Sequence, residues 1–161
     1  MNQSIINVAR YVRDLLDYDE NLIQFDRKNT QQSDAVTGYI VVNGSGVGRA
    51  MSHGSGYDGD NEVMEYSTAI AKPITLEFYG SSAYENAELF MLLNKSQKAR
   101  EISRDLGLTI YDVSQDTDVK QLLGYQYGNR IHIDFNIQYC PSVAVDVLRV
   151  DATEYDILVD D

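Results

Sequence analysis

Glycine spacing gives the first candidate for chemistry, because Gly44, Gly46 and Gly48 stand at alternate positions directly after an apolar stretch. Backbone N–H groups in such a run can cradle a phosphate. A phosphate-binding loop, however, has four residues between its glycines and continues into Lys-Ser or Lys-Thr, whereas Gly48 is followed by Arg49 and Ala50. No helical pattern follows either, as a dinucleotide site would require. We therefore expect no cofactor, and a small nucleotide-binding enzyme stays an alternative.

The two histidines, His53 and His132, are the candidates for general bases. Nucleophilic catalysis needs a Ser or Cys beside a histidine that an acid orients. Ser52 precedes His53, but neighbours in a glycine-rich segment are not held at the ~3 Å that proton transfer requires. His132 lies on the polar side of an alternating stretch, which is typical of a surface or subunit contact. The sequence therefore predicts no catalytic residue and no enzyme.

Carboxylates gather at two places, Asp58, Asp60 and Glu62, and then Asp116 and Asp118. Hard cations bind such oxygens, but neither group has the spacing of a calcium loop. Cys140 is the one cysteine, which excludes an internal disulfide and a cysteine-based zinc site. We expect solvated acids in turns and at a helix start, and no metal.

The charge of the chain restricts its partners. The 161 residues include 25 Asp and Glu against 13 Lys and Arg, a formal charge of −12. Such a charge repels nucleic acids and anionic membranes. The apolar run 89–93 is far shorter than the ~20 residues that cross a bilayer, and the start of the chain lacks a secretory signal. We expect no membrane partner and synthesis in the cytoplasm.

Periodicity predicts the helices and strands. Apolar spacings of three and four predict helices at 5–16, 83–93 and 96–106, and a short helix is expected at 116–123. Strand patterns cover 22–25, 37–42, 62–71, 74–79 and 108–111. The strongest alternation runs from Arg130 to Tyr139, and Val143, Val145 and Val147 restart it as a hairpin partner or an edge strand. These elements predict an α+β fold, a mainly antiparallel sheet backed by two or three helices.

The segment 43–61 carries six of the 11 glycines. Ordering glycine costs much backbone entropy, so we expect a long, flexible glycine-rich loop there. The remaining elements fit a single domain over 1–150. The tail 151–161 holds five acids and no base, with Tyr155, Ile157 and Val159 at alternate positions. It is expected to be a frayed acidic end or a strand donated to a neighbour.

Tyrosine is the most informative residue type, with 12 copies and no Trp in the chain. Tyrosine combines contact area with a polar tip and is enriched where proteins meet, although about half of these positions fit ordinary strands and core. Without a catalytic constellation, this composition favours an assembly protein. The candidate interface residues are Gly44, Gly46, Gly48, Arg49, His53, Tyr57, Tyr125, Tyr127 and Tyr155.

Four stretches in order follow an N-terminal helix and a strand that ends in a long polar loop: 74–80, 83–93, 107–111 and 130–139. Together, over 5–150, they resemble the neck or tail-terminator proteins of tailed bacteriophages. The resemblance implies a small α+β subunit that forms a hexameric ring on the last ring of the tail tube. Such a ring stops tube polymerisation and presents a surface to the connector of the DNA-filled head. The family offers no active site to transfer.

The resemblance also implies partners and a location. The partners would be further copies of the chain, the tail tube protein and the head–tail connector, and the location would be the neck of the virion. Six copies would carry six times the charge of −12, so an acidic lumen would let DNA slide past as non-sticking cargo. Another virion part, such as a tube, baseplate or head-completion protein, shares the same fold logic and stays an alternative.

Overall fold

A computed structural model of the chain describes residues 3–25, 38–44, 46–115, 117–118, 121–123 and 126–147, without the side chains of 121–128. It is an α+β fold, as the sequence predicts. The helices are α1 (Gln3–Leu16), α2 (Ala83–Leu93) and α3 (Gln97–Asp105), with a short 3-10 helix at Glu20–Leu22. The strands are β1 (Ile23–Phe25), β2 (Tyr39–Asn43), β3 (Arg49–Asp58), β4 (Val63–Tyr79), β5 (Leu108–Tyr111), β6 (Thr117–Asp118), β7 (Gln121–Leu123), β8 (Gln126–Gly128), β9 (Arg130–Tyr139) and β10 (Ser142–Asp146).

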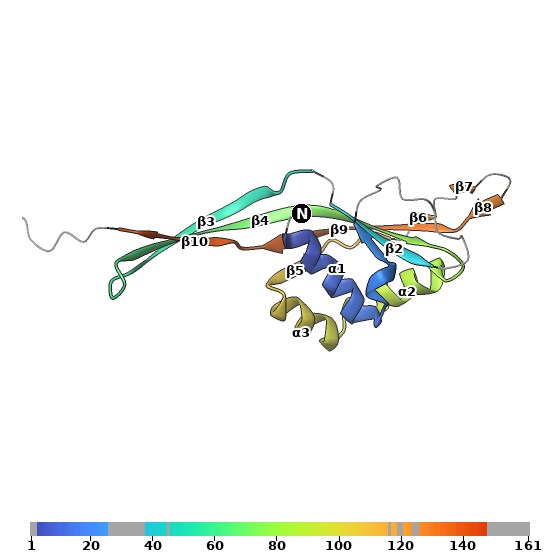
Figure 1. Cartoon of the computed structure of the whole chain (residues 1–161), viewed down its shortest axis with the longest axis horizontal. Coiled ribbons are helices and arrows are strands. Elements are labelled where there is room, and N and C mark those ends of the chain that lie inside the picture. Colours follow the sequence, from blue (N-terminus) through green and yellow to red (C-terminus); the bar gives the residue numbers. More distant parts are fainter. Residues whose placement is uncertain are drawn as a thin grey trace, which may run out of the picture.

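Eight of these strands form one sheet, which is antiparallel except for the pairing of β1 with β2. Its central order is β1-β2-β4-β9-β5, while β3 and β10 also pair with β4 and β6 pairs with β9. The three helices lie together on one face of the central strands (Figure 1). The core fills the space between this face and the helices, and its largest fully buried side chains include Tyr11, Phe78, Phe90 and Leu15.

The helices begin and end within two residues of the predicted bounds, and α2 matches them at both ends. α1 buries one stripe that includes Val8, Val12 and Leu15, because apolar residues at spacings of three and four share a helix face. The side chain of Ser96 accepts a hydrogen bond from the backbone N–H of Ala99 and so caps α3. Beyond α3, Gly107 has a φ of 63°, a left-handed conformation that glycine adopts without a Cβ penalty.

β4 and β9 place alternate side chains in the core. Ile74, Leu76 and Phe78 on β4 are buried toward the helices, and β9 contributes Ile131, Ile133, Phe135 and Ile137 on the same side. β4 runs unbroken through Pro73, at the point where its neighbour on one edge changes from β3 to β2. Neither strand is paired with β4 at Pro73, so the missing N–H leaves both pairings intact.

Half of β4 extends beyond the helices. Residues 63–71 of β4, together with β3 and β10, form a three-stranded ribbon that we call the arm (Figure 1). The expected glycine-rich loop over 43–61 is therefore wrong for Arg49–Asp58, which is a strand in register with β4. The ladder of backbone hydrogen bonds to β4 outweighs the entropy that the glycines lose, which composition alone does not reveal.

The expected short helix at 116–123 is also wrong where the structure describes it. Thr117 and Asp118 form β6 and pair with His132 and Ile131 of β9, and Gln121–Leu123 is a strand that pairs with β8. Pairing with a strand that is already formed overrides a weak helical pattern. The tail 151–161, expected to be a frayed acidic end or a donated strand, lies outside the described residues.

Candidate functional site

The arm has two different faces, which follow from its register. Residues directly opposite each other on antiparallel strands point to the same face of a sheet. One cross-strand row is Tyr57, Met64 and Val145, and a second row two residues along is Ser55, Tyr66 and Val143. Because strand side chains alternate with a period of two, both rows lie on one face. We call Tyr57, Met64, Tyr66, Val143 and Val145 the apolar face of the arm.

This apolar face is uncovered. The exposed fractions are 50% for Tyr57, 46% for Tyr66, 59% for Val143 and 46% for Val145. Along β4, the face continues through Ile70 into Ile74, which the helices bury. Thr68 and Lys72 lie on the same side of β4 and separate the exposed apolar residues of the arm from the core, and the helices cover only the part over the central strands (Figure 1). The arm part lacks a second layer within the described chain.

The opposite face of the arm is polar. Its rows are Asp58, Val63 and Asp146, then Gly56, Glu65 and Ala144, then Gly54, Ser67 and Ser142. Three carboxylates and several small residues occupy this face, where only Val63 is a large aliphatic side chain. A ribbon that separates its side chains in this way is amphipathic, so its two faces suit different surroundings.

The turn at the end of the arm is held by Asp58. Its carboxylate accepts hydrogen bonds from the backbone N–H groups of Asp60 and Asn61 and from the Asn61 side-chain amide. The Asn61 side chain, followed by the two backbone donors, lowers the pKa of Asp58 because each favours the charged carboxylate. Both oxygens of Asp58 are thus engaged in shaping the turn, which is the role expected of a turn acid.

The candidate glycines lie in the crossing from β2 to β3. A Cβ on Gly44 would meet the side chain of Ile5, and a Cβ on Gly48 would meet Ile70. Gly46 has a φ of 82°. These glycines therefore allow a close crossing over α1 and β4 and a change of direction. The residues after Gly48 enter a strand, so the helix N-terminus of a phosphate-binding loop does not follow them.

The other candidates are only partly placed. Arg49, His53 and Tyr57 all lie on β3, where every residue is exposed. His53 contacts the Thr68 hydroxyl through Nδ1 at 3.0 Å, on the same face as Tyr57. Tyr127 lies on β8, but its side chain is not described, and Tyr125 and Tyr155 fall outside the described residues. Their part in an interface stays a prediction.

Sequence reasoning missed four members of the apolar face: Met64, Tyr66, Val143 and Val145. The alternation of Val143 and Val145 was visible, but it does not say which residues of another strand share their face. That information is the register with β4, which only the fold supplies.

A buried polar cluster lies on the sheet side away from the helices. Glu77 is 1% exposed and accepts hydrogen bonds from Arg130 at 3.0 Å and from the Tyr79 hydroxyl at 2.5 Å. His132 Nε2 lies 3.8 Å from the same carboxylate. The Tyr39 ring stacks on Tyr79 with centroids 4.5 Å apart, and burial, then the charge of Glu77, raises the pKa of Tyr39. The cluster pairs the buried Glu77 carboxylate with the largely covered Arg130 guanidinium, as a structural ion pair does.

Among the described residues, no group of three or more His, Cys, Asp or Glu could hold a metal ion. Within the same residues, none of the helices has the length and apolar character needed to span a membrane. Cys140 is exposed and free.

Comparison with known proteins supplies the identity. The family model described as phage neck terminator protein matches residues 2–160, nearly the whole chain. A search of curated proteins found no match. A match over this length establishes the family. The chain belongs to the phage neck terminator protein family and is a structural protein of the virion neck.

Proposed function

We propose that the protein assembles into a hexameric ring that caps the tail tube, ends its polymerisation and offers the head connector a surface to bind. The number of copies and the two partners are those that the family resemblance implies. Self-assembly is supported by one observation above all, the uncovered apolar face of the arm.

The apolar face of the arm lacks a second layer in the described chain. A sheet that is apolar on one side must bury that side against another layer, and a ribbon of few strands is marginal in water without one. Burial yields about 25 cal/mol for each Å² of apolar surface, so leaving Tyr57, Tyr66, Val143 and Val145 in water forgoes a substantial stabilisation. Another subunit in the ring supplies this layer, which places His53 and Tyr57 in the contact.

The polar face of the arm carries three carboxylates, which supports a role beside DNA. Asp58, Glu65 and Asp146 lie on it, and the whole chain carries a charge of −12. A ring that turns this face to its lumen repels the phosphate backbone, because affinity for DNA grows with the number of phosphates that cations neutralise. In this arrangement the genome passes the ring without binding to it.

Imaging of the purified full-length protein tests the ring. We expect negative-stain particles with a central hole and a native mass of six chains. A monomer at the concentration used for imaging contradicts the proposal.

Reconstitution tests the joining role. Phage made without this protein should accumulate DNA-filled heads and separate tails, and added purified protein should join them. The copy number separates this role from the alternatives, because a terminator forms one ring in each particle whereas a tube protein is present in many. Joined particles in the absence of the protein would contradict the role.

A further inference from the structure

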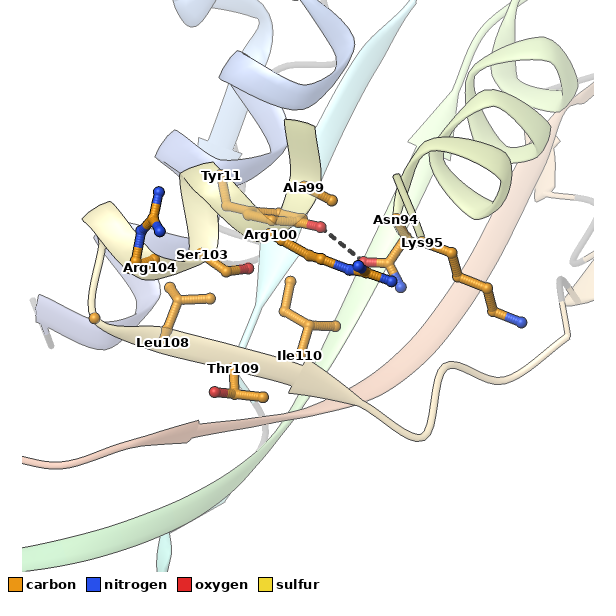
Figure 2. A pocket seen from close by; sticks show the side chains of 11 residues that line it. Tyr11, Asn94, Lys95, Ala99, Arg100, Ser103, Arg104, Leu108, Thr109 and Ile110 are labelled. Atoms are coloured by element: carbon orange, nitrogen blue, oxygen red, sulfur yellow. Dashed lines mark hydrogen bonds between the residues drawn. The ribbon is translucent and has the colours of Figure 1, made fainter. Parts of the chain in front are cut away.

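A second surface, separate from the arm, is a groove between α3 and the edge strand β5. It has a volume of about 700 Å³ and opens to solvent along β5 (Figure 2). β5 pairs with β9 on one edge, and among the described residues no strand pairs with its other edge. The lining residues are Tyr11, Asn94, Lys95, Ala99, Arg100, Ser103, Arg104, Gly107, Leu108, Thr109 and Ile110.

The groove combines an apolar floor with a cationic rim. Leu108 and Ile110 of β5 point toward α3, and Thr109 points away (Figure 2). Lys95, Arg100 and Arg104 stand around the opening and are exposed. Within the described parts of the chain, none of these three cations forms an ion pair, although the chain as a whole is strongly acidic. The groove therefore suits an occupant that is both apolar and acidic.

The chain itself contains a segment of that chemistry. Residues 154–161 read Glu-Tyr-Asp-Ile-Leu-Val-Asp-Asp, with Tyr155, Ile157 and Val159 at alternate positions and four acids among the others. In an extended segment, alternate side chains point to opposite sides. Tyr155, Ile157 and Val159 would then meet the floor of the groove, and the acids would meet its rim.

We propose that the acidic C-terminal segment 154–161 of one copy docks in the groove between α3 and β5 of a neighbouring copy. Its carboxylates pair with Lys95, Arg100 and Arg104, and its apolar side chains pack on Leu108 and Ile110. This inference rests on the self-assembly part of the proposed function and names a contact that holds the copies together.

Chain length favours a neighbour over the same copy. Val147 lies at the far end of the arm, where its N–H bonds to the carbonyl of Glu62, whereas the groove begins where Leu108 pairs with Tyr139. β9 and β10 keep one register along β4, so the eight residues from Tyr139 to Val147 span ~27 Å. The next eight residues, up to Tyr155, span at most the same ~27 Å. A C-terminal segment that folded back to the groove of its own copy would need all eight of these residues to cover the distance, and none would remain to form the turn.

Charge argues against duplex DNA as the occupant. Three rim cations belong to a chain whose formal charge is −12, so the surrounding field repels a polyanion. A short segment with four acids carries far less charge than duplex DNA, so it meets a weaker long-range repulsion, and assembly holds it at high local concentration beside the same three cations. The experiment must therefore distinguish docking of the C-terminal segment from binding of duplex DNA.

Disulfide trapping tests the contact in the full-length chain. Cys140→Ser gives a background without thiols, in which one sample carries Ser103→Cys in the groove and the other carries Ile157→Cys in the tail. Mixed and mildly oxidised, they should yield a covalent dimer on a non-reducing gel. The matched control replaces Ser103→Cys with Ser81→Cys, an exposed serine away from the groove, and should yield none.

Three results would overturn the proposal. The first is no dimer although the native mass shows the assembled ring, which leaves the proposed function standing. The second is cross-linking only within a single chain that carries both thiols. The third is binding of a duplex DNA probe at physiological salt that Arg100→Glu abolishes, which assigns the groove to nucleic acid. An absence of any assembly, by contrast, refutes the proposed function together with this contact.

Charge exchange completes the test. Arg100→Glu with Arg104→Glu should reduce the yield of the trapped dimer at least tenfold, and Glu154→Lys with Asp156→Lys in the tail partner should restore it. Variants whose melting temperature matches that of the unmodified chain are compared, so loss without restoration, or a yield that neither change affects, would contradict the proposed pairing.

Discussion

Arg130 donates a hydrogen bond of 3.0 Å to the buried carboxylate of Glu77 on the sheet side away from the helices, where the exposed fractions of the two side chains are 11% and 1%. The two residues come from adjacent strands, β9 and β4, whose register places Arg130 opposite Tyr79, two residues along β4 from Glu77. A buried ion pair of this kind does not add much stability over an apolar pair, but it makes the loss of either partner costly.

Removing the cation should therefore destabilise the fold strongly. Arg130→Met removes the guanidinium from the buried Glu77 carboxylate and should lower the free energy of unfolding by about 3 kcal/mol. Adding Glu77→Gln should recover a large part of that loss. Arg13→Met is the control, since Arg13 pairs with Asp14 and Glu20 at the surface and its loss should cost less than about 1 kcal/mol. Urea denaturation measures all three, and equal costs for Arg130→Met and Arg13→Met would contradict the account.

Tyr11 should make the protein sensitive to alkali. Burial raises its pKa from 10 to about 12, and a hydrogen bond with Ser103 opposes that shift. Because the folded state disfavours the phenolate, neutral Tyr11 makes its full contribution to the free energy of unfolding below pH 10. This contribution is lost as the pH rises toward 12, by roughly 1.4 kcal/mol for each pH unit. Tyr11→Phe removes this dependence, together with the hydrogen bond to Asn94.

The measurement compares the two proteins at two pH values. Wild type should be more stable than Tyr11→Phe at pH 9, by about 1 kcal/mol for the lost hydrogen bond. At pH 11 that advantage should disappear, since only wild type carries the buried Tyr11 phenol, whose ionisation the folded state opposes. A difference that stays constant between the two pH values would show that Tyr11 does not titrate as its burial requires.

Adding a Cβ at Gly107 should lower the free energy of unfolding. A Cβ there meets nothing within 4 Å, so the strain comes from its φ of 63° alone. Gly107→Ala should lower the free energy of unfolding by about 1 kcal/mol. Gly56→Ala is the matched control, because Gly56 also has open space for a Cβ but no left-handed φ. Thermal unfolding that ranks the two variants the other way round would contradict this assignment.

The sequence predicted those elements that local periodicity determines. α1 and β9 carry their buried faces in their own spacing, so both could be placed from the residues alone. The strand at Arg49–Asp58 could not, because its glycine and serine content resembles a loop and its stabilisation comes from pairing with β4. The same holds for Thr117 and Asp118, which are a strand only because β9 lies beside them.

The candidate interface also contains some residues that the sequence could select and others that only the fold reveals. Tyr57 could be selected from its residue type and its setting in a glycine-rich stretch. Its companions Met64 and Val145 become one surface with it only through the cross-strand register, which joins three distant parts of the chain. Residue type is a local property, but a face of a sheet is a property of the pairing.

One pair of substitutions tests the central claim, that the apolar face of the arm is where copies of the chain meet. Val145 and Ala144 are consecutive exposed residues of β10 that point to opposite faces of the arm. The measurement is the native mass of each variant by light scattering after size-exclusion chromatography. Val145→Asp should give monomers whose helices and central strands melt at an unchanged temperature, while Ala144→Asp should keep the wild-type assembly. An assembled Val145→Asp protein, or equal loss of assembly in both variants, would contradict the claim.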